Sequence, residues 1–379
     1  MIFFKRPVYN YFYLAAVIFL SVYIVSWIQQ QHDWGGWALT LFFVSIAIAF
    51  RAHEFLQRLS FTVIIFAAVT LALYHPGYFQ QWGSYKLSNL IIPLIQLIMF
   101  GMGTSMSLKD FAAVIKTPKG VVIGVFSQFI IMPLMGFMLA TVTDFPPEIA
   151  AGIVLIGCSP SGLASNVMSY LAKANLALSI TITSITTLLA PFITPVLMKL
   201  LAGALIEIDV VKMMWDIIKM IIIPIGAGLL FNRLLSGRSK WLDKAMPMVS
   251  MFGIAFILTI ITAAGRDSLL KIGPALIAVV LIHNTFGYFL GYWSGRLFKL
   301  PESDCRTIAI EVGMQNAGLA SGIAKEMGKI ATVGLAPAVF GPLMNITGSS
   351  LASWWHGRTP KEEKKDQDIY EQPVNYSTP

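Results

Sequence analysis

The stretch EVGMQNAGLASG (Glu311–Gly322) decides the fold, because it places a carboxylate, two amides and three glycines between apolar segments. A second stretch, GCSPSGLASN (Gly157–Asn166), contains the same tetrapeptide Gly-Leu-Ala-Ser about 156 residues earlier. Both follow a proline-marked loop and a short apolar run, and a long apolar span follows each. Glycine and proline interrupt helices. The pattern therefore predicts two broken helices related by internal duplication.

The composition is that of a membrane protein. Of the 379 residues, 56% are hydrophobic and only 12% are charged, whereas soluble domains carry about 25% charged residues. Runs such as Tyr11–Ile28 approach the roughly 20 apolar residues that cross a bilayer. We therefore predict an all-α polytopic membrane protein surrounded by lipid. The net charge of +8 is explained by basic cytoplasmic loops, so no nucleic-acid partner is predicted.

Polar residues, glycines and prolines divide the chain into about twelve predicted spans. Most of the 27 Lys and Arg residues lie on one side if both termini are cytoplasmic, as the positive-inside rule requires. This predicts a multi-pass protein of the plasma (inner) membrane. The predicted span cores are 11–28, 35–51, 59–77, 87–107, 119–142, 147–171, 175–203, 208–232, 246–264, 272–295, 304–328 and 331–356.

The two broken helices fall in the sixth and eleventh predicted spans. Because five spans separate them, they enter the membrane from opposite sides, and the duplication is inverted. Paired broken helices in inverted repeats mark secondary transporters. The backbone groups that such breaks free are tolerated only where they line a cavity. The alternative is that the glycines serve only close helix packing, which does not require Glu311.

The polar residues near the breaks are oxygen donors. A carboxylate within a span is costly and marks a functional site, and Gln315 lies one helical turn after Glu311. Carboxylate, amide and hydroxyl oxygens suit a hard cation such as sodium. The further candidate ligands within spans are Gln128, Ser165, Asn166, Ser179 and Thr183.

At these residues the sequence resembles the bile acid–sodium symporter family. The matching pieces are FGMGTSMSLKDF (100–111), SQFIIMP (127–133), GCSPSGLASNVMSYLAKANLALSITITS (157–184), HNTFGY (283–288), EVGMQNAGLA (311–320) and NITGSSLA (345–352). The resemblance implies two inverted five-helix repeats, with two broken, crossing helices beside a smaller panel of helices. The implied divisions are an additional N-terminal helix pair (1–58), a first repeat (59–203), a second repeat (204–357) and a cytoplasmic tail (358–379).

The resemblance also implies two sodium sites that share Glu311. The first would use Ser165, Asn166, Ser179, Thr183 and Glu311. The second would use Gln128, Glu311, Gln315 and the carbonyls of Val312 and Met314. The implied substrate-binding residues are Leu163, Asn316, Met344 and Asn345. Two of these positions depart from the family. The family often has a small or hydroxyl residue at the position of Leu163 and a histidine at the position of Met344. The expected substrate is therefore an organic anion, either bile-acid-like or a smaller carboxylate such as a pantoate-type acid.

The leading interpretation is a sodium-coupled symporter that works by alternating access. Its alternative is a proton-coupled transporter of organic anions in which Glu311 is the titrating group. An intramembrane enzyme is not expected, because the spans contain no Gly-x-Ser-x-Gly, His-Glu-x-x-His or paired aspartates. A channel is disfavoured because no filter repeat is visible. His283 is interpreted as a structural residue, and no oligomeric state is predicted.

Overall fold

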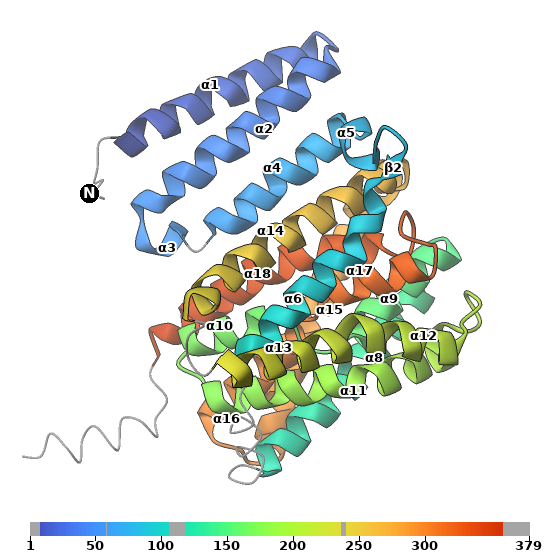
Figure 1. The fold of residues 1–379 in the computed structure, drawn as a ribbon. Helices are drawn as coiled ribbons and strands as arrows, with labels where there is room; N and C mark the ends of the chain where they lie inside the picture. The colour runs from blue at the N-terminus through green and yellow to red at the C-terminus, as the bar shows by residue number, and fades with distance from the viewer. Residues whose placement is uncertain (1–7, 58, 106–117, 236–239, 359–379) are drawn as a thin grey trace, which may run out of the picture.

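The computed structural model describes residues 8–57, 59–105, 118–235 and 240–358. This part of the chain is mostly helical (Figure 1), with one two-stranded antiparallel hairpin, β1 (Gln81–Trp82) and β2 (Tyr85–Lys86). The predicted cytoplasmic tail from residue 359 onward and residues 106–111 of the first family motif lie outside the described residues.

One set of helices, which we call the layer, begins at the N-terminus. Each member packs on the next: α1 on α2, α2 on α4, α4 on α14, α14 on α6, and α6 on α13. Figure 1 shows the first of these helices side by side. The layer consists of α1 (Val8–Ile28), α2 (His32–Ala49), α4 (Ser60–Tyr74), α6 (Ile91–Ser105), α14 (Lys240–Ala264) and a continuous segment of α12 (Val210–Ile217), the π-helical η4 (Ile218–Ile222) and α13 (Ile223–Leu235).

Short elements link the layer helices. They are η1 (Phe50–Ala52), α3 (Glu54–Gln57), α5 (Gly77–Gln80) and η2 (Leu87–Leu90). Helix α1 contacts the rest of the molecule chiefly through α2, and only its Ala16 and Ser26 side chains are buried. The Tyr23 hydroxyl nevertheless lies 3.2 Å from that of Tyr74 on α4. An apolar helix that exposes nearly all of its surface suits contact with lipid.

The second set of helices, the bundle, surrounds the two broken helices. Every residue from Ile149 to Cys158 and from Asp304 to Gly313 is buried. These two segments therefore form the centre of the bundle. The bundle consists of α8 (Pro118–Val142), α9 (Pro147–Cys158), α10 (Ala164–Leu171), α11 (Leu176–Ala202), α15 (Arg266–Leu297), α16 (Glu302–Gly313), α17 (Ala317–Glu326) and α18 (Leu335–His356).

Seven helices in the described residues are long and apolar enough to cross a membrane. The two predicted spans 147–171 and 304–328 each contain a pair of short helices, α9–α10 and α16–α17, separated by a break. The chain is thus an all-α, multi-pass membrane protein. The seven candidate spans are Val8–Ile28, Asp33–Ala52, Leu87–Thr104, Pro118–Val142, Leu176–Ala202, Val210–Leu234 and Arg266–Leu297.

A buried arginine, Arg306, connects the start of α16 to the C-terminal ends of α10 and α18. Arg306 in α16 donates through Nε to Glu302 at 3.0 Å, and through Nη1 to the carbonyls of Ala172 and Trp355 at 3.2 and 3.3 Å. These carbonyls follow α10 and end α18, so one guanidinium caps two other helices. These contacts fix the start of α16. The other end of this helix, at Gly313, adjoins the second break.

Candidate functional site

The two broken helices cross at their breaks. The backbone N–H of Gly162 donates to the carbonyl of Met314 at 2.9 Å, and that of Asn316 donates to the carbonyl of Pro160 at 2.8 Å. Backbone groups that a continuous helix would satisfy internally are therefore paired across the crossing. A Cβ at Gly162 would lie 2.7 Å from the Gln315 carbonyl oxygen, so the close approach requires glycine.

The carboxylate of Glu311 lies beside this crossing and is completely buried. Its Oε1 accepts hydrogen bonds from Ser165 Oγ at 2.6 Å and from Ser179 Oγ at 2.5 Å. Its Oε2 accepts one from Thr183 Oγ1 at 2.7 Å. Asn166 Oδ1 lies 2.9 Å from Ser179 Oγ and 3.3 Å from Thr183 Oγ1. The structure thus brings together all five residues of the first expected sodium site, from α10, α11 and α16.

The amides of the second expected site bond to each other and to the backbone of the two breaks. Gln128 Nε2 donates to the Ser159 carbonyl at 2.9 Å and to Gln315 Oε1 at 2.7 Å. Gln315 Nε2 donates to the carbonyl of Val312 at 2.6 Å. Ser161 and Gln315 form an isolated antiparallel bridge. The two glutamines are therefore held face to face by the backbone of the breaks.

The two groups contact different parts of Glu311. The hydrogen bonds of its carboxylate run to hydroxyl groups, including those of Ser165, Ser179 and Thr183. The link to the glutamines is instead Ser161, whose Oγ donates to the main-chain carbonyl of Glu311 at 2.9 Å and lies 3.5 Å from Gln128 Oε1. The carbonyl of Met314, another expected ligand, accepts the Gly162 N–H.

The four expected substrate residues lie at the starts of α10 and α17 and in the middle of α18. Asn316 Oδ1 caps α17 by accepting the backbone N–H of Leu319 at 3.0 Å, and Leu163 is the residue before α10. Asn345 Nδ2 donates to the carbonyl of Gly341 in its own helix at 3.1 Å, and Met344 is buried. Both asparagines therefore engage their own helices, and among the described residues no hydrogen bond joins any two of the four.

Two residues at the crossing were not predicted. Ser161 occupies the first break itself, and a hydroxyl between Pro160 and Gly162 was the signal that could have identified it. Asn284 in α15 donates through Nδ2 to the carbonyl of Gly313, the last residue of α16, at 2.8 Å. Thr347 in turn donates to Asn284 Oδ1 at 2.6 Å. A buried amide in an apolar span was the corresponding signal.

Replacing Asn284 by leucine is expected to lower the free energy of unfolding by about 1–3 kcal/mol, because the buried Gly313 carbonyl loses its donor. The measurement is the thermal unfolding midpoint in detergent. Thr285→Val is the matched control, because the Thr285 hydroxyl is exposed and bonds only the Leu281 carbonyl of its own helix. Equal midpoints for the two variants would contradict this role of Asn284.

The chemistry of the site suits a hard monovalent cation. Its donors are carboxylate, amide, hydroxyl and carbonyl oxygens, and the described residues contain no cluster of three or more His, Cys, Asp or Glu side chains. No ion pair to Glu311 occurs among the described residues. A fully buried carboxylate normally requires a positive partner. Glu311 and its neighbouring oxygens therefore fit a bound sodium ion, which would supply that charge.

The fold and the site define a helical membrane transport protein, and comparisons with known proteins agree. The profile of the Sodium Bile acid symporter family matches residues 92–272. The uncharacterized sodium-dependent transporter YocS of Bacillus subtilis is 37% identical over 308 residues, which cover 81% of this chain and 93% of that protein.

Plant chloroplast proteins are also similar. The probable sodium/metabolite cotransporter BASS1 of Oryza sativa subsp. japonica is 31% identical over 311 residues, covering 80% of this chain and 74% of that protein. The probable sodium/metabolite cotransporter BASS6 of Arabidopsis thaliana is 31% identical over 302 residues, covering 77% and 73%. This chain belongs to the sodium bile acid symporter family. The resemblance found in the sequence is confirmed, and the protein belongs to a family of sodium-dependent transporters whose members are not enzymes.

Proposed function

We propose that this protein is a secondary active transporter that carries an organic acid, bearing a carboxylate, across the membrane together with sodium. The observation that carries the proposal is the Glu311 carboxylate, which is fully buried and receives hydrogen bonds from three hydroxyl side chains. Hydroxyl oxygens can accept from water or coordinate a cation as readily as they donate. Binding of sodium would turn their lone pairs toward the ion and neutralise the buried charge.

The first sodium ion would be held by the five clustered residues, Ser165, Asn166, Ser179, Thr183 and Glu311. A second ion would enter between Gln128 and Gln315, which now bond each other at 2.7 Å. It would take the amide oxygens together with carbonyls of Val312 and Met314. In the structure Ser161 links the two positions through the Glu311 main chain. Ser161 would thus couple the two sodium positions, because it contacts both Gln128 and the main chain of Glu311.

The repeat proposed from the sequence is supported by the helix bounds. A shift of about 156 residues carries α9 (Pro147–Cys158) to within one residue of α16 (Glu302–Gly313). The same shift carries α8 into α15 and α11 onto α18. The antiparallel bridge between Ser161 and Gln315 is consistent with opposite directions of the two breaks. We accordingly divide the chain into the helix pair 1–58, the repeats 59–203 and 204–357, and the tail 358–379.

The substrate would bind where the second half-helices begin. Leu163 and Asn316 adjoin the N-termini of α10 and α17, where free N–H groups favour a negative group. Asn345 and Met344 on α18 would line the same space. Transport would follow from movement of the bundle against the layer, and bound sodium must favour one of the two states for coupling. In this proposal the protein spans a plasma (inner) membrane with both termini cytoplasmic.

The proposal is tested by thermal unfolding of the detergent-purified protein over a range of sodium concentrations. Potassium and choline chloride at equal ionic strength are the controls. A ligand that binds only the folded state adds about 2.7 kcal/mol of stability at a hundred times its Kd. Stabilisation specific to sodium is the expected result. Equal behaviour in the three salts, with stability that instead follows pH, would replace sodium coupling with proton coupling.

A narrower prediction concerns Thr183. Thr183→Val keeps the shape of the side chain but removes the hydroxyl that donates to Glu311 Oε2 at 2.7 Å. We expect about a tenfold weaker apparent affinity for sodium in the thermal assay, which corresponds to about 1.4 kcal/mol. Thr186→Val is the matched control one turn later, because its hydroxyl bonds the carbonyls of Ile182 and Thr183 within its own helix. A weaker affinity in both variants, or in neither, would contradict a ligand role for Thr183.

A further inference from the structure

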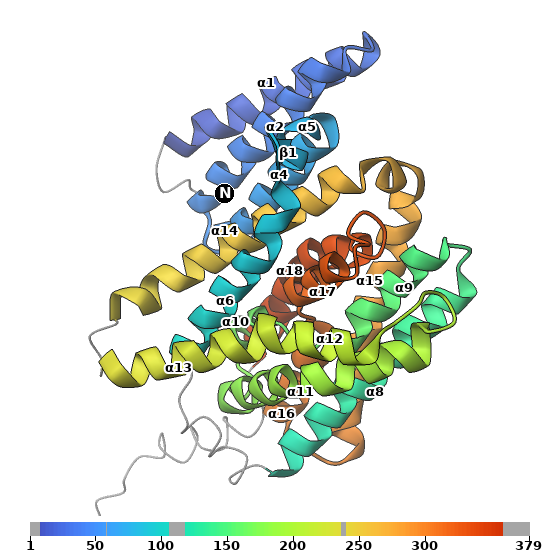
Figure 2. The same ribbon diagram turned by 45° about the vertical axis from the view of Figure 1, so that its right-hand side comes forward.

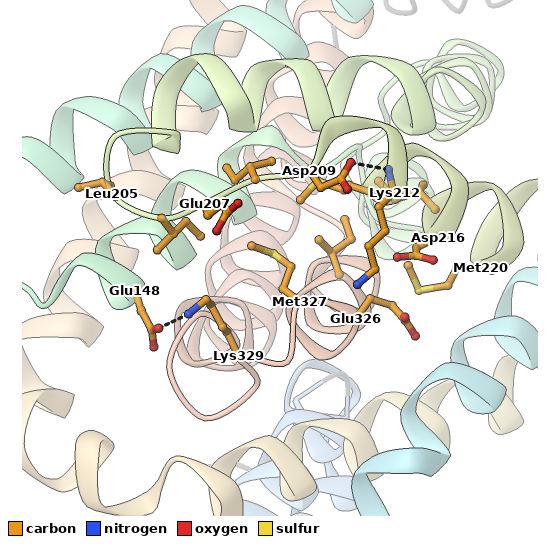
Figure 3. A pocket seen from close by; sticks show the side chains of 15 residues that line it. Glu148, Leu205, Glu207, Asp209, Lys212, Asp216, Met220, Glu326, Met327 and Lys329 are labelled. Atoms are coloured by element: carbon orange, nitrogen blue, oxygen red, sulfur yellow. Dashed lines mark hydrogen bonds and ion pairs between the residues drawn. The ribbon is translucent and has the colours of Figure 1, made fainter.

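A pocket of about 560 Å³ lies between the layer and the bundle, away from the Glu311 cluster. Figure 3 shows it among the start of α9, the segment that joins α11 to α12, and the end of α17. Helices α12 and α17 contact each other beneath it. A volume in the range of about 300–1,000 Å³ is typical of sites for small molecules. The pocket therefore has the size of a small-molecule site and is lined by residues of both sets of helices.

The deep wall of the pocket is apolar. Met213, Ile217 and Met220 contribute from the layer, Ile323 contributes from α17, and Met327 follows the end of α17. The first four of these side chains are buried. Ile323 is seven residues after Asn316, so it lies about 10 Å along α17 from the crossing. A molecule in this pocket would place an apolar body against methionine and isoleucine.

The rim of the pocket carries charges of both signs. Carboxylates outnumber ammonium groups by five to two. The carboxylate residues are Glu148, Glu207, Asp209, Asp216 and Glu326, and the ammonium residues are Lys212 and Lys329. A substrate that carried only negative charge would meet a net negative rim, which repels it.

Several of these charges already have partners. Lys329 pairs with Glu148. Asp209 accepts the backbone N–H of Lys212 at 2.9 Å, and Asp216 lies 3.8 Å from Lys219. The rim groups without an ion pair among the described residues are then the Lys212 ammonium and the carboxylates of Glu207, Asp209 and Glu326.

Lys212 and Glu326 belong to opposite walls. Lys212 extends from α12 in the layer toward Glu326 of α17 in the bundle (Figure 3). Among the described residues, neither side chain makes an ion pair within 4.0 Å. Lys212 and Glu326, each without an ion pair among the described residues, thus face each other across a cavity with an apolar floor.

We infer that this pocket receives a zwitterion with an apolar body, namely an amino carboxylate whose carboxylate contacts Lys212 and whose ammonium contacts Glu326. The inference rests on the proposed function, in which the transported molecule bears a carboxylate, and it adds the ammonium group. An amino carboxylate offers an opposite charge to both Lys212 and Glu326, and it carries no net negative charge for the rim to repel. It also bridges the layer and the bundle, so its binding would draw the two together.

The experiment uses the full chain in detergent with saturating sodium, and follows the unfolding midpoint with three matched sets of compounds. The sets are built on valine, leucine and phenylalanine. Each contains the amino acid, the acid that lacks the amine, and the amine that lacks the carboxylate. We expect at least one amino acid to raise the midpoint while its two partners at equal concentration do not. Equal stabilisation by the deaminated acids, or no stabilisation by any amino acid, would overturn the inference.

Two substitutions locate the binding. Lys212→Met and Glu326→Gln are each expected to weaken the apparent affinity for the stabilising amino acid at least tenfold and to leave the sodium response unchanged. Lys271→Met is the control, since Lys271 is an exposed lysine of α15 that does not line the pocket. Retained affinity in both pocket variants would overturn the assignment.

Measuring the unfolding midpoint with and without sodium distinguishes failure of this inference from failure of the proposed function. If sodium stabilises the wild type and the amino acids do not, the pocket assignment is wrong and sodium coupling stands. If sodium has no effect on the midpoint, the sodium-coupled function and the pocket assignment that rests on it are both wrong.

Discussion

Glu311→Gln is expected to abolish the stabilisation of this protein by sodium and to stop sodium-driven transport. Glutamine has nearly the same shape as glutamate, so the three hydroxyls that surround Oε1 and Oε2 keep a partner of the same size. What is lost is the buried negative charge that offsets the cost of dehydrating a cation. At a sodium concentration of a hundred times Kd, the loss corresponds to about 2.7 kcal/mol of stability.

The direction of the effect without sodium is also informative. In the ion-free wild type, the Glu311 carboxylate is buried and forms no ion pair with the described residues. Removing its charge therefore relieves a desolvation cost. We expect Glu311→Gln to be at least as stable as the wild type in choline chloride and less stable than the wild type in sodium chloride. The two midpoint curves should cross as the sodium concentration rises.

Glu302→Gln on the same helix is the control. Glu302 pairs with Arg306 at 3.0 Å and with Arg296 at 3.6 Å, and it lies at the end of α16 remote from the break. This substitution should lower stability in every salt and leave the difference between sodium and choline intact. A full sodium response in Glu311→Gln would remove Glu311 from the cation site. Loss of the response in both variants would show that it depends on the integrity of α16 alone.

The central chemistry of the site was predictable from sequence because membrane spans tolerate few polar groups. Glu311 and Gln315 lie within an apolar span, so they cannot be explained as residues of a solvent-exposed surface. The glycines beside them predict a break in the helix. The two breaks are present at residues 159–163 and 314–316. The hydroxyls of Ser179 and Thr183, one turn apart on α11, face Glu311 as a shared helical face predicts.

Contacts between distant segments could not be predicted in the same way. Gln128 and Gln315 bond each other across 187 residues of sequence, and no local pattern determines which of their many possible partners each amide takes. The pocket between α12 and α17 depends on how the layer packs against the bundle. Lys212 lies on a helix whose sequence indicates only a span that begins near a membrane surface. Its role becomes visible only when Glu326 is placed opposite it (Figure 3).

Gly162→Ala is expected to have the second large effect, because it forces the crossing apart. The added Cβ would lie 2.7 Å from the carbonyl oxygen and 3.1 Å from the carbonyl carbon of Gln315. Backbone atoms of a buried bridge cannot rotate away as a flexible side chain can. We expect a loss of about 1–3 kcal/mol in stability, as for other overpacked interiors, together with loss of the sodium response.

The sodium response should fail in Gly162→Ala because the same crossing positions both groups of ligands. Gly162 N–H donates to the Met314 carbonyl at 2.9 Å, and Ser161 and Ser165 lie on either side of it. Gly226→Ala in α13 is the control, because a Cβ there has no atom within 4 Å and alanine stabilises a helix by about 0.5–1 kcal/mol relative to glycine. If Gly162→Ala matches Gly226→Ala in midpoint and in sodium response, the crossing must be wider than described and cannot hold the two groups of ligands together.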